Sequence, residues 1–185
     1  MSRKSRVSKG KTINPTFFVF CEGQTEEQYL NYLRLQYRLP IIIDSKISGN
    51  RINEKYISEY KKTKDIHPKD KTFLVYDLDI SGMLDNLQSI KNTILISSNP
   101  CFELWYLLHC QDQRSFLTAE DCHRRLSVHC KYYKKGSIDS QLKSKLREKQ
   151  EKAMTRAHKL VEHQNPSTLV YRFIIALEEV RKESR

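Results

Sequence analysis

Three acidic residues stand directly after two runs of β-forming residues, a placement that can create a cation site. Glu22 follows the run from Thr16 to Cys21. Asp77 and Asp79 follow the run from Lys71 to Tyr76, and side chains two positions apart in an extended chain point the same way. Like charges held together repel unless a proton or a cation offsets them, and Mg²⁺ prefers hard oxygen ligands. The pattern therefore favours a Mg²⁺ site, although an Asp-x-Asp pair alone is also common in surface loops.

These acids need a scaffold that brings the ends of both runs to one place. Apolar runs predict strands at residues 16–21, 40–44, 71–76 and 93–97. Helical periodicity predicts helices at residues 26–38, 53–64 and 83–91, and a further helix that begins at Asn99-Pro100. Alternating strands and helices imply an α/β fold with a parallel sheet of about four strands flanked by helices. Ligands of such sheets bind beyond the carboxyl ends of the strands, where the acids stand.

The rest of the chain predicts helices and no further strand. Thr25 is the expected N-cap of the first helix, because Gln28 completes a capping-box spacing. Beyond His109 the patterns predict helices at residues 118–130, 138–163 and 167–182. We therefore divide the chain into three parts, which are a basic flexible arm at 1–12, an α/β domain at 13–110 and a helical, basic C-terminal region at 111–185.

The charge of the chain favours a polyanionic partner. The 185 residues carry a net charge of +11, and residues 131–160 hold ten Lys or Arg against three Asp or Glu. Such a field attracts nucleic-acid backbones or anionic membranes, although a merely basic soluble protein is the alternative.

No apolar run reaches the length of a membrane span, and none follows the N-terminus as a signal peptide would require. The five cysteines, without a CxxC pair, suit reduced thiols in the cytoplasm.

One short segment combines bases and aromatics in a pattern typical of nucleic-acid contacts. Tyrosine can stack on unpaired bases while lysine meets phosphate. A solvated loop between helices is the alternative interpretation. The candidate nucleic-acid-binding residues are Lys131, Tyr132, Tyr133, Lys134 and Lys135.

The sequence around the acids resembles known motifs. Residues 19–27 resemble the glutamate turn of the Toprim fold, and residues 75–79 resemble its Asp-x-Asp turn. These motifs alone would also admit primases, topoisomerases and nucleases of the overcoming-lysogenization type. The block from Ser98 to Trp105, followed by His109, and the segment Asn165 to Thr168 are similar to the RloB-like family. This resemblance covers roughly residues 14–183 and makes 13–110 a Toprim-like domain.

The resemblance implies a metal-dependent nuclease effector of a bacterial antiphage-defence (abortive infection) system, acting on RNA such as tRNA. Mg²⁺, or alternatively Mn²⁺, would be held by Glu22, Glu26, Asp77 and Asp79, with Glu26 preferred over its neighbour Glu27 because it stands four residues after Glu22.

The resemblance also implies a controlling partner ATPase of the ABC type. Nucleic acid and a second copy of the chain are further admissible partners, whereas a membrane is not. A non-catalytic module that binds nucleic acid or the ATPase, and a Toprim DNase or nickase, are the alternatives.

Glu103 is a further candidate for the catalytic group. It stands among large apolar residues in the block that resembles the family. It could serve as an additional acidic ligand or could orient a basic group, whereas a first-turn glutamate favoured by the helix dipole is the alternative.

Overall fold

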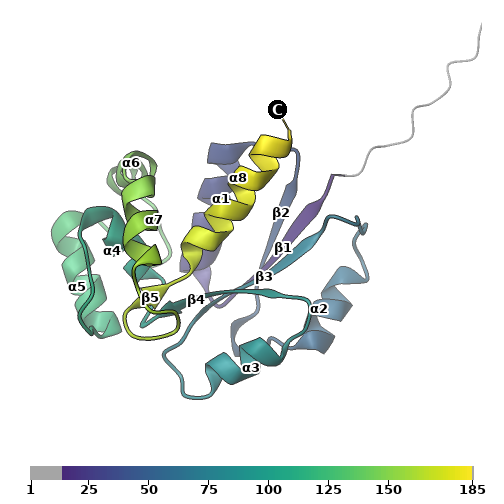
Figure 1. Ribbon diagram of the computed structural model, residues 1–185, viewed down its shortest axis with the longest axis horizontal. Coiled ribbons are helices and arrows are strands. Elements are labelled where there is room, and N and C mark those ends of the chain that lie inside the picture. Colours follow the sequence, from purple (N-terminus) through teal and green to yellow (C-terminus); the bar gives the residue numbers. More distant parts are fainter. Residues whose placement is uncertain (1–13, 185) are drawn as a thin grey trace, which may run out of the picture.

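The sheet of this protein has five strands in the order β2-β1-β3-β4-β5 (Figure 1). The computed structural model describes residues 14–184, so the predicted arm at 1–12 lies outside the described residues. The first four strands run parallel, whereas β5 is antiparallel to β4. The strands are β1 (Thr16–Cys21), β2 (Ile42–Ile47), β3 (Lys71–Asp77), β4 (Ile94–Asn99) and β5 (Ser167–Thr168). The predicted α/β class with a mostly parallel sheet is confirmed.

Eight α-helices and one short 3₁₀ helix accompany these strands in the described range of 14–184. They are α1 (Gln24–Tyr37), the 3₁₀ helix Gly49–Arg51, α2 (Glu54–Lys61), α3 (Met83–Ser89), α4 (Glu103–Cys110), α5 (Ala119–His129), α6 (Ser140–Glu148), α7 (Gln150–His158) and α8 (Val170–Glu183). None of these helices combines the length and apolar character needed to cross a membrane.

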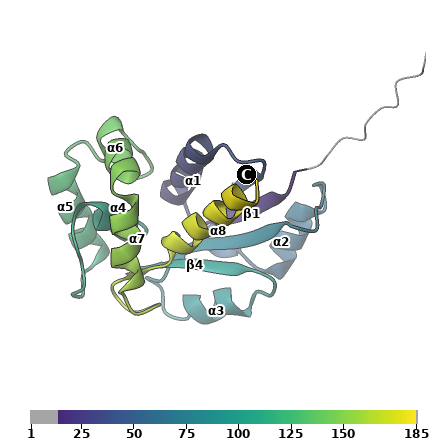
Figure 2. The ribbon, with the colours of Figure 1, turned by 45° about the horizontal axis from the view of Figure 1, so that its top comes forward.

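Helices cover both faces of the sheet, which explains why the central strands are apolar throughout. Figure 2 shows α1 and α8 on one face of the sheet and α2 and α3 on the other. Alternate residues of β1 point to opposite faces, so Val19 belongs to the core cluster of the first layer and Phe20 to that of the second. The last helix is tied to the sheet through Phe173, whose ring lies 4.8 Å from that of Phe73. The C-terminal helix therefore belongs to the layer that flanks the sheet.

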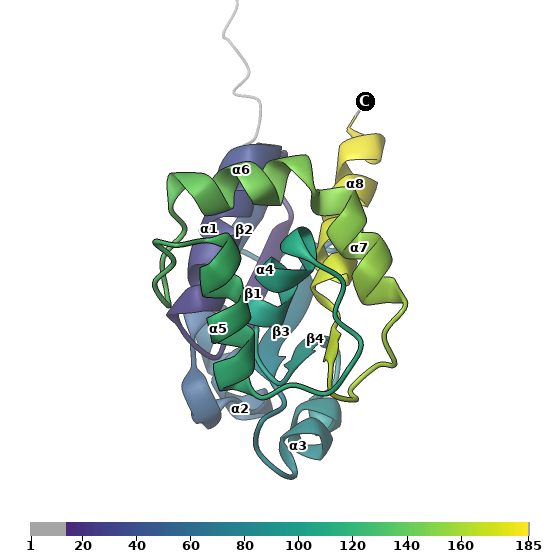
Figure 3. The same cartoon turned by 90° about the vertical axis from the view of Figure 1, so that its left-hand side faces the viewer.

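The remaining helices form a bundle beside the carboxyl ends of the strands. Helix α4 is buried on every side, because residues 104–109 are fully covered, and Figure 3 shows α5, α6 and α7 around it. A helix that is apolar all round is expected only in such an interior position. One core cluster runs from the sheet through α4 into this bundle, so the two parts share their packing.

Three predicted boundaries were wrong for identifiable reasons. Helix α1 begins before Thr25, because Gly23 is its N-cap and Glu26 accepts a hydrogen bond from the Gly23 amide. Pro100 does not open a helix, since β4 continues to Asn99 and pairs there with β5. The helix predicted at 138–163 is interrupted at Lys149, where the chain turns so that α6 and α7 both bury apolar residues.

The strand predictions needed two further corrections. The second strand starts at Ile42 rather than residue 40, because the pairing with β1 starts with Ile42 opposite Thr16. The prediction that no strand follows His109 was wrong as well, because Ser167 and Thr168 form β5 and the helix predicted at 167–182 begins only at Val170. β5 has only two residues, which is too short for a pattern of alternation to reveal.

Candidate active site at the carboxyl edge of the sheet

Glu22 and Asp77 meet where two neighbouring parallel strands end. Cys21 of β1 lies opposite Val75 of β3, which brings the next residues to the same edge. The Asp77 amide donates a hydrogen bond of 2.9 Å to Oε2 of Glu22, which fixes that carboxylate. Burial is the largest influence on the pKa of Glu22 and raises it, and the charge of Asp79 adds to this. The hydrogen bond from the Asp77 amide and the charge of Lys135 lower the pKa, but the net shift is upward.

Glu26 reaches the same edge from the first turn of α1. Its side chain is only 5% exposed, and Oε2 accepts a 3.1 Å hydrogen bond from the Gly23 amide. Burial, together with the charges of Glu103 and Glu22, raises the pKa of Glu26 to about 7. The tight turn after β1 therefore places a second glutamate beside the first, in a setting that disfavours its negative charge.

Asp77 carries an oxygen atom that lacks a partner. Its Oδ1 is covered and has no hydrogen-bond partner among residues 14–184. Burial raises the pKa of Asp77 well above its ordinary range, and the charges of Glu26 and Glu22 add to this. A buried carboxylate oxygen is costly unless a donor, a proton or a cation satisfies it. Asp79 lies two residues beyond, exposed to solvent at the rim.

Glu103 lies deeper, at the start of α4, and is held by three side chains. It is 1% exposed, and its Oε1 accepts hydrogen bonds from the Tyr133 hydroxyl at 2.8 Å and the Thr25 hydroxyl at 3.4 Å. Nε2 of His123 lies 3.3 Å from the same oxygen. Burial alone would raise the pKa of Glu103, but His123 and Tyr133 outweigh it and the pKa is lowered. Glu103 is therefore an anion that faces a basic group.

Sequence reasoning missed Thr25 and His123 as members of this group. Thr25 was assigned to helix capping, but its hydroxyl donates to Glu103 and accepts from the Gly136 amide at 3.1 Å. His123 stands on an amphipathic helix, twenty residues from Glu103, and no short motif links the two. Only the packing of α5 against α4 brings them together.

The lysine-rich loop lies beside the carboxylates. Lys135 is near enough to lower the pKa of Glu22 through its charge, and Lys131, Tyr132 and Lys134 are exposed as well. Tyr133 differs from the expectation, because its hydroxyl is engaged by Glu103 and its ring packs inward. The loop thus exposes three lysines and one aromatic ring, and it brings Lys135 to the acids.

The model of the RloB-like protein family matches residues 17–177, which is most of the chain. The chain belongs to the RloB-like family. Comparisons with curated proteins and with solved structures gave no match. The matched range includes nearly all of the sheet, the helical bundle and each candidate residue described above, so the match covers the candidate site as well as the fold.

The acids of this RloB-like protein suit a hard divalent cation. Glu22, Glu26, Asp77 and Asp79 all offer carboxylate oxygens, and the charges of Glu22, Glu26 and Asp79 each raise the pKa of at least one neighbour. A bound cation would offset that repulsion and satisfy the orphaned oxygen of Asp77. These donors therefore fit Mg²⁺ or Mn²⁺.

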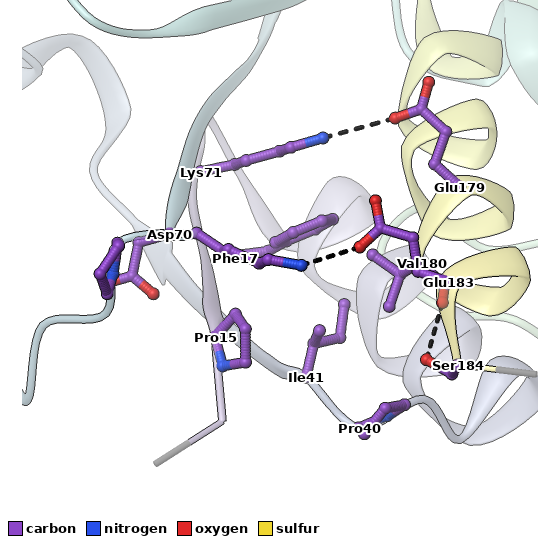
Figure 4. A pocket seen from close by; sticks show the side chains of 12 residues that line it. Pro15, Phe17, Pro40, Ile41, Asp70, Lys71, Glu179, Val180, Glu183 and Ser184 are labelled. Carbon is purple, nitrogen blue, oxygen red and sulfur yellow. Dashed lines mark hydrogen bonds and ion pairs between the residues drawn. The ribbon is translucent and has the colours of Figure 1, made fainter.

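A groove in the RloB-like protein lies at the opposite, amino-terminal edge of the sheet (Figure 4). Apolar residues such as Pro15 and Ile41 line it. Its lysines are already paired with carboxylates of α8, as in the 3.4 Å contact between Lys71 and Glu179. None of the candidate site residues lines this groove, so the groove is separate from the candidate active site.

Proposed function

We propose that this RloB-like protein is a metal-dependent nuclease effector of a bacterial antiphage-defence (abortive infection) system. It hydrolyses phosphodiester bonds in RNA such as tRNA. The observation that carries the proposal is the set of acids at the carboxyl edge of the sheet, where the covered Oδ1 of Asp77 has no partner among the described residues. Membership of a Toprim-related family supports the same reading.

The acidic side chains have separate tasks in this proposal. Glu22, Glu26, Asp77 and Asp79 hold Mg²⁺ or Mn²⁺, and Glu22 is oriented for this by the Asp77 amide. Divalent ions in such sites activate water and stabilise the leaving oxygen. Because the pKa of Glu26 is about 7 without a cation, binding of the metal displaces a proton there near neutral pH. Glu103 acts behind this set by orienting His123 and Tyr133.

The lysine loop supplies affinity for the substrate. Lys131, Lys134 and Lys135 are exposed for contacts with phosphates, and the ring of Tyr132 is 72% exposed. An exposed aromatic ring can stack on an unpaired base, which favours single-stranded regions such as the loops of a folded RNA. The position of Lys135 beside Glu22 would direct the backbone of the nucleic acid toward the acids.

Control by a partner ATPase of the ABC type is the second part of the proposal. Its basis is the resemblance to antiphage effectors, which act only when infection releases them. Co-expression with the product of a neighbouring ATPase gene, followed by pull-down, tests the interaction. A chain that is toxic alone and indifferent to every neighbouring gene product would contradict it. Light scattering of the purified protein tests whether two copies associate.

The activity is tested by incubating the purified protein with tRNA and with plasmid DNA. Each reaction contains Mg²⁺, Mn²⁺ or an excess of chelator. Asp77→Asn keeps the size of the side chain and replaces a charged ligand with a neutral one. Cleavage should then fall about a hundredfold or more, because losing an ion from such a site removes several kcal/mol of transition-state stabilisation. Asp65→Asn, an exposed residue before β3, is the matched control and should cut normally.

The two substrates separate the alternatives. Cleavage of plasmid but not of tRNA would make the protein a DNase or nickase. Binding of either nucleic acid without cleavage under any condition would make it a non-catalytic module. Equal cleavage by the wild type in excess chelator, or by Asp77→Asn, would show that the carboxylates are structural and that the proposal is wrong.

A further inference from the structure

A second group of side chains with metal-ligating atoms lies near the start of α4. It consists of Cys101, Glu103 and His123, which we call the Cys-Glu-His cluster. One ligand atom from each residue lies within 4.8 Å of the other two. Cys101 comes from the turn between β4 and α4, Glu103 opens α4 and His123 belongs to α5. The first two are almost completely buried.

The spacing within the cluster fits a shared ion better than a direct hydrogen bond. Nε2 of His123 lies 3.3 Å from Oε1 of Glu103, yet this covered nitrogen makes no hydrogen bond to any described residue. The ring nitrogen therefore faces the carboxylate oxygen without an assigned hydrogen bond, which leaves it available as a metal ligand. A tetrahedral zinc ion would place its nitrogen and oxygen ligands about 3.4 Å apart.

The three ligand types indicate the class of metal. A thiolate, an imidazole and a carboxylate together suit Zn²⁺ and its chemical relatives, whereas Mg²⁺ takes oxygen ligands alone. Two further side chains orient the carboxylate of Glu103, because the hydroxyls of Tyr133 and Thr25 donate to it. Such outer hydrogen bonds are a regular feature of metal sites in proteins.

We propose that the Cys-Glu-His cluster is a site for a thiophilic divalent metal of the zinc class. On binding, the Cys101 thiol gives up its proton to solvent and the metal joins the start of α4 to α5. Three protein ligands leave one tetrahedral position open. The site does not rest on the proposed nuclease activity, because neither Cys101 nor His123 belongs to the acids assigned to Mg²⁺. It would brace the lysine loop, since Tyr133 holds Glu103 from that loop.

Cobalt titration tests the site directly. The full-length protein is stripped with a chelator, kept reduced with a phosphine rather than a thiol, and titrated with Co²⁺ in excess Mg²⁺. Co²⁺ occupies zinc sites, and its bond to a thiolate absorbs in the near ultraviolet, whereas Mg²⁺ at carboxylates gives no such band. We expect a band that saturates at a single equivalent and disappears when Zn²⁺ is added.

Matched variants identify the ligands. Cys101→Ser should abolish the band, whereas Cys130→Ser, which alters another fully buried thiol at the end of α5, should retain it. Tyr133→Phe should keep the band but weaken Co²⁺ binding about tenfold or more, because an outer partner of a ligand is lost. Circular dichroism checks that each variant is folded. Zn²⁺ should raise the midpoint of thermal unfolding of the wild type and of Cys130→Ser, but not that of Cys101→Ser.

Two results would overturn the proposal. One is the absence of a thiolate band in the wild type at Co²⁺ concentrations that saturate the protein. The other is a band that persists in folded Cys101→Ser. Asp77→Asn should retain the band, so a failure of the nuclease proposal and a failure of the zinc-class site give different results.

Discussion

The raised pKa of Glu26 leads to a measurable dependence of stability on pH. Burial and the neighbouring carboxylates raise this pKa from its ordinary 4.5 to about 7. The folded protein therefore favours the protonated carboxyl, and this contribution is fully present below pH 4.5 and lost as the pH rises to about 7. At about 1.36 kcal/mol per pKa unit, the loss amounts to about 3 kcal/mol. Glu26→Gln should remove it, while its amide oxygen can still accept the Gly23 hydrogen bond.

Urea unfolding of chelator-treated protein between pH 5 and pH 8 measures this difference. The free energy of unfolding of the wild type should fall by about 3 kcal/mol more than that of Glu26→Gln over this interval. Mg²⁺ added at pH 8 should return about 3 kcal/mol to the wild type at a hundred times its dissociation constant, and less to the variant. Parallel curves for the two proteins without metal would refute the assigned environment of Glu26.

Two further predictions concern the lysine loop and the centre of α4. Replacing Lys134 and Lys135 together by Gln should weaken RNA binding, because two phosphate contacts are lost. The slope of the logarithm of the binding constant against the logarithm of the salt concentration should become shallower by up to about two. Filter binding at several salt concentrations measures this slope, and an unchanged slope would exclude these contacts. His109 is fully buried, and burial lowers its pKa to about 4. Its contribution to stability is present above pH 6.5 and lost as the pH falls to about 4, so His109→Gln should flatten the acid limb of the stability curve by about 3 kcal/mol. Urea unfolding between pH 7 and pH 4 tests this, and an acid limb as steep as that of the wild type would contradict it.

The sheet and its acidic edge could be predicted because their signals are local. Strands β1 and β3 are short apolar runs, and the acids come directly after them. All strands of a parallel sheet end at the same edge, so the sequence placed Glu22 and Asp77 at one edge, while their direct contact depends on β1 and β3 being neighbours. The approach of Glu26 followed from its place four residues later, at the start of a helix.

The rest could not be predicted because it depends on contacts between distant segments. Two capping signatures compete at the start of α1, and the one made by Gly23 and Glu26 prevails over the one that starts at Thr25. Thr25 is thereby freed to contact Glu103. The approach of His123 to Glu103 depends on how α5 packs on α4, and no spacing in the sequence encodes that packing.

The pairing of β4 with β5 makes the helical bundle an insertion between two strands of the sheet rather than a C-terminal extension. Asn99, the last residue of β4, lies opposite Ser167, so the chain leaves the sheet and returns to it at neighbouring positions. Both ends of residues 100–166 are therefore held at the sheet, and α8 follows directly to cover one of its faces. The exposed turns between the helices of this insertion, unlike the buried α4, can lengthen at little cost, since longer loops add little closure entropy. A single protease cut within it would leave two pieces that still share one sheet.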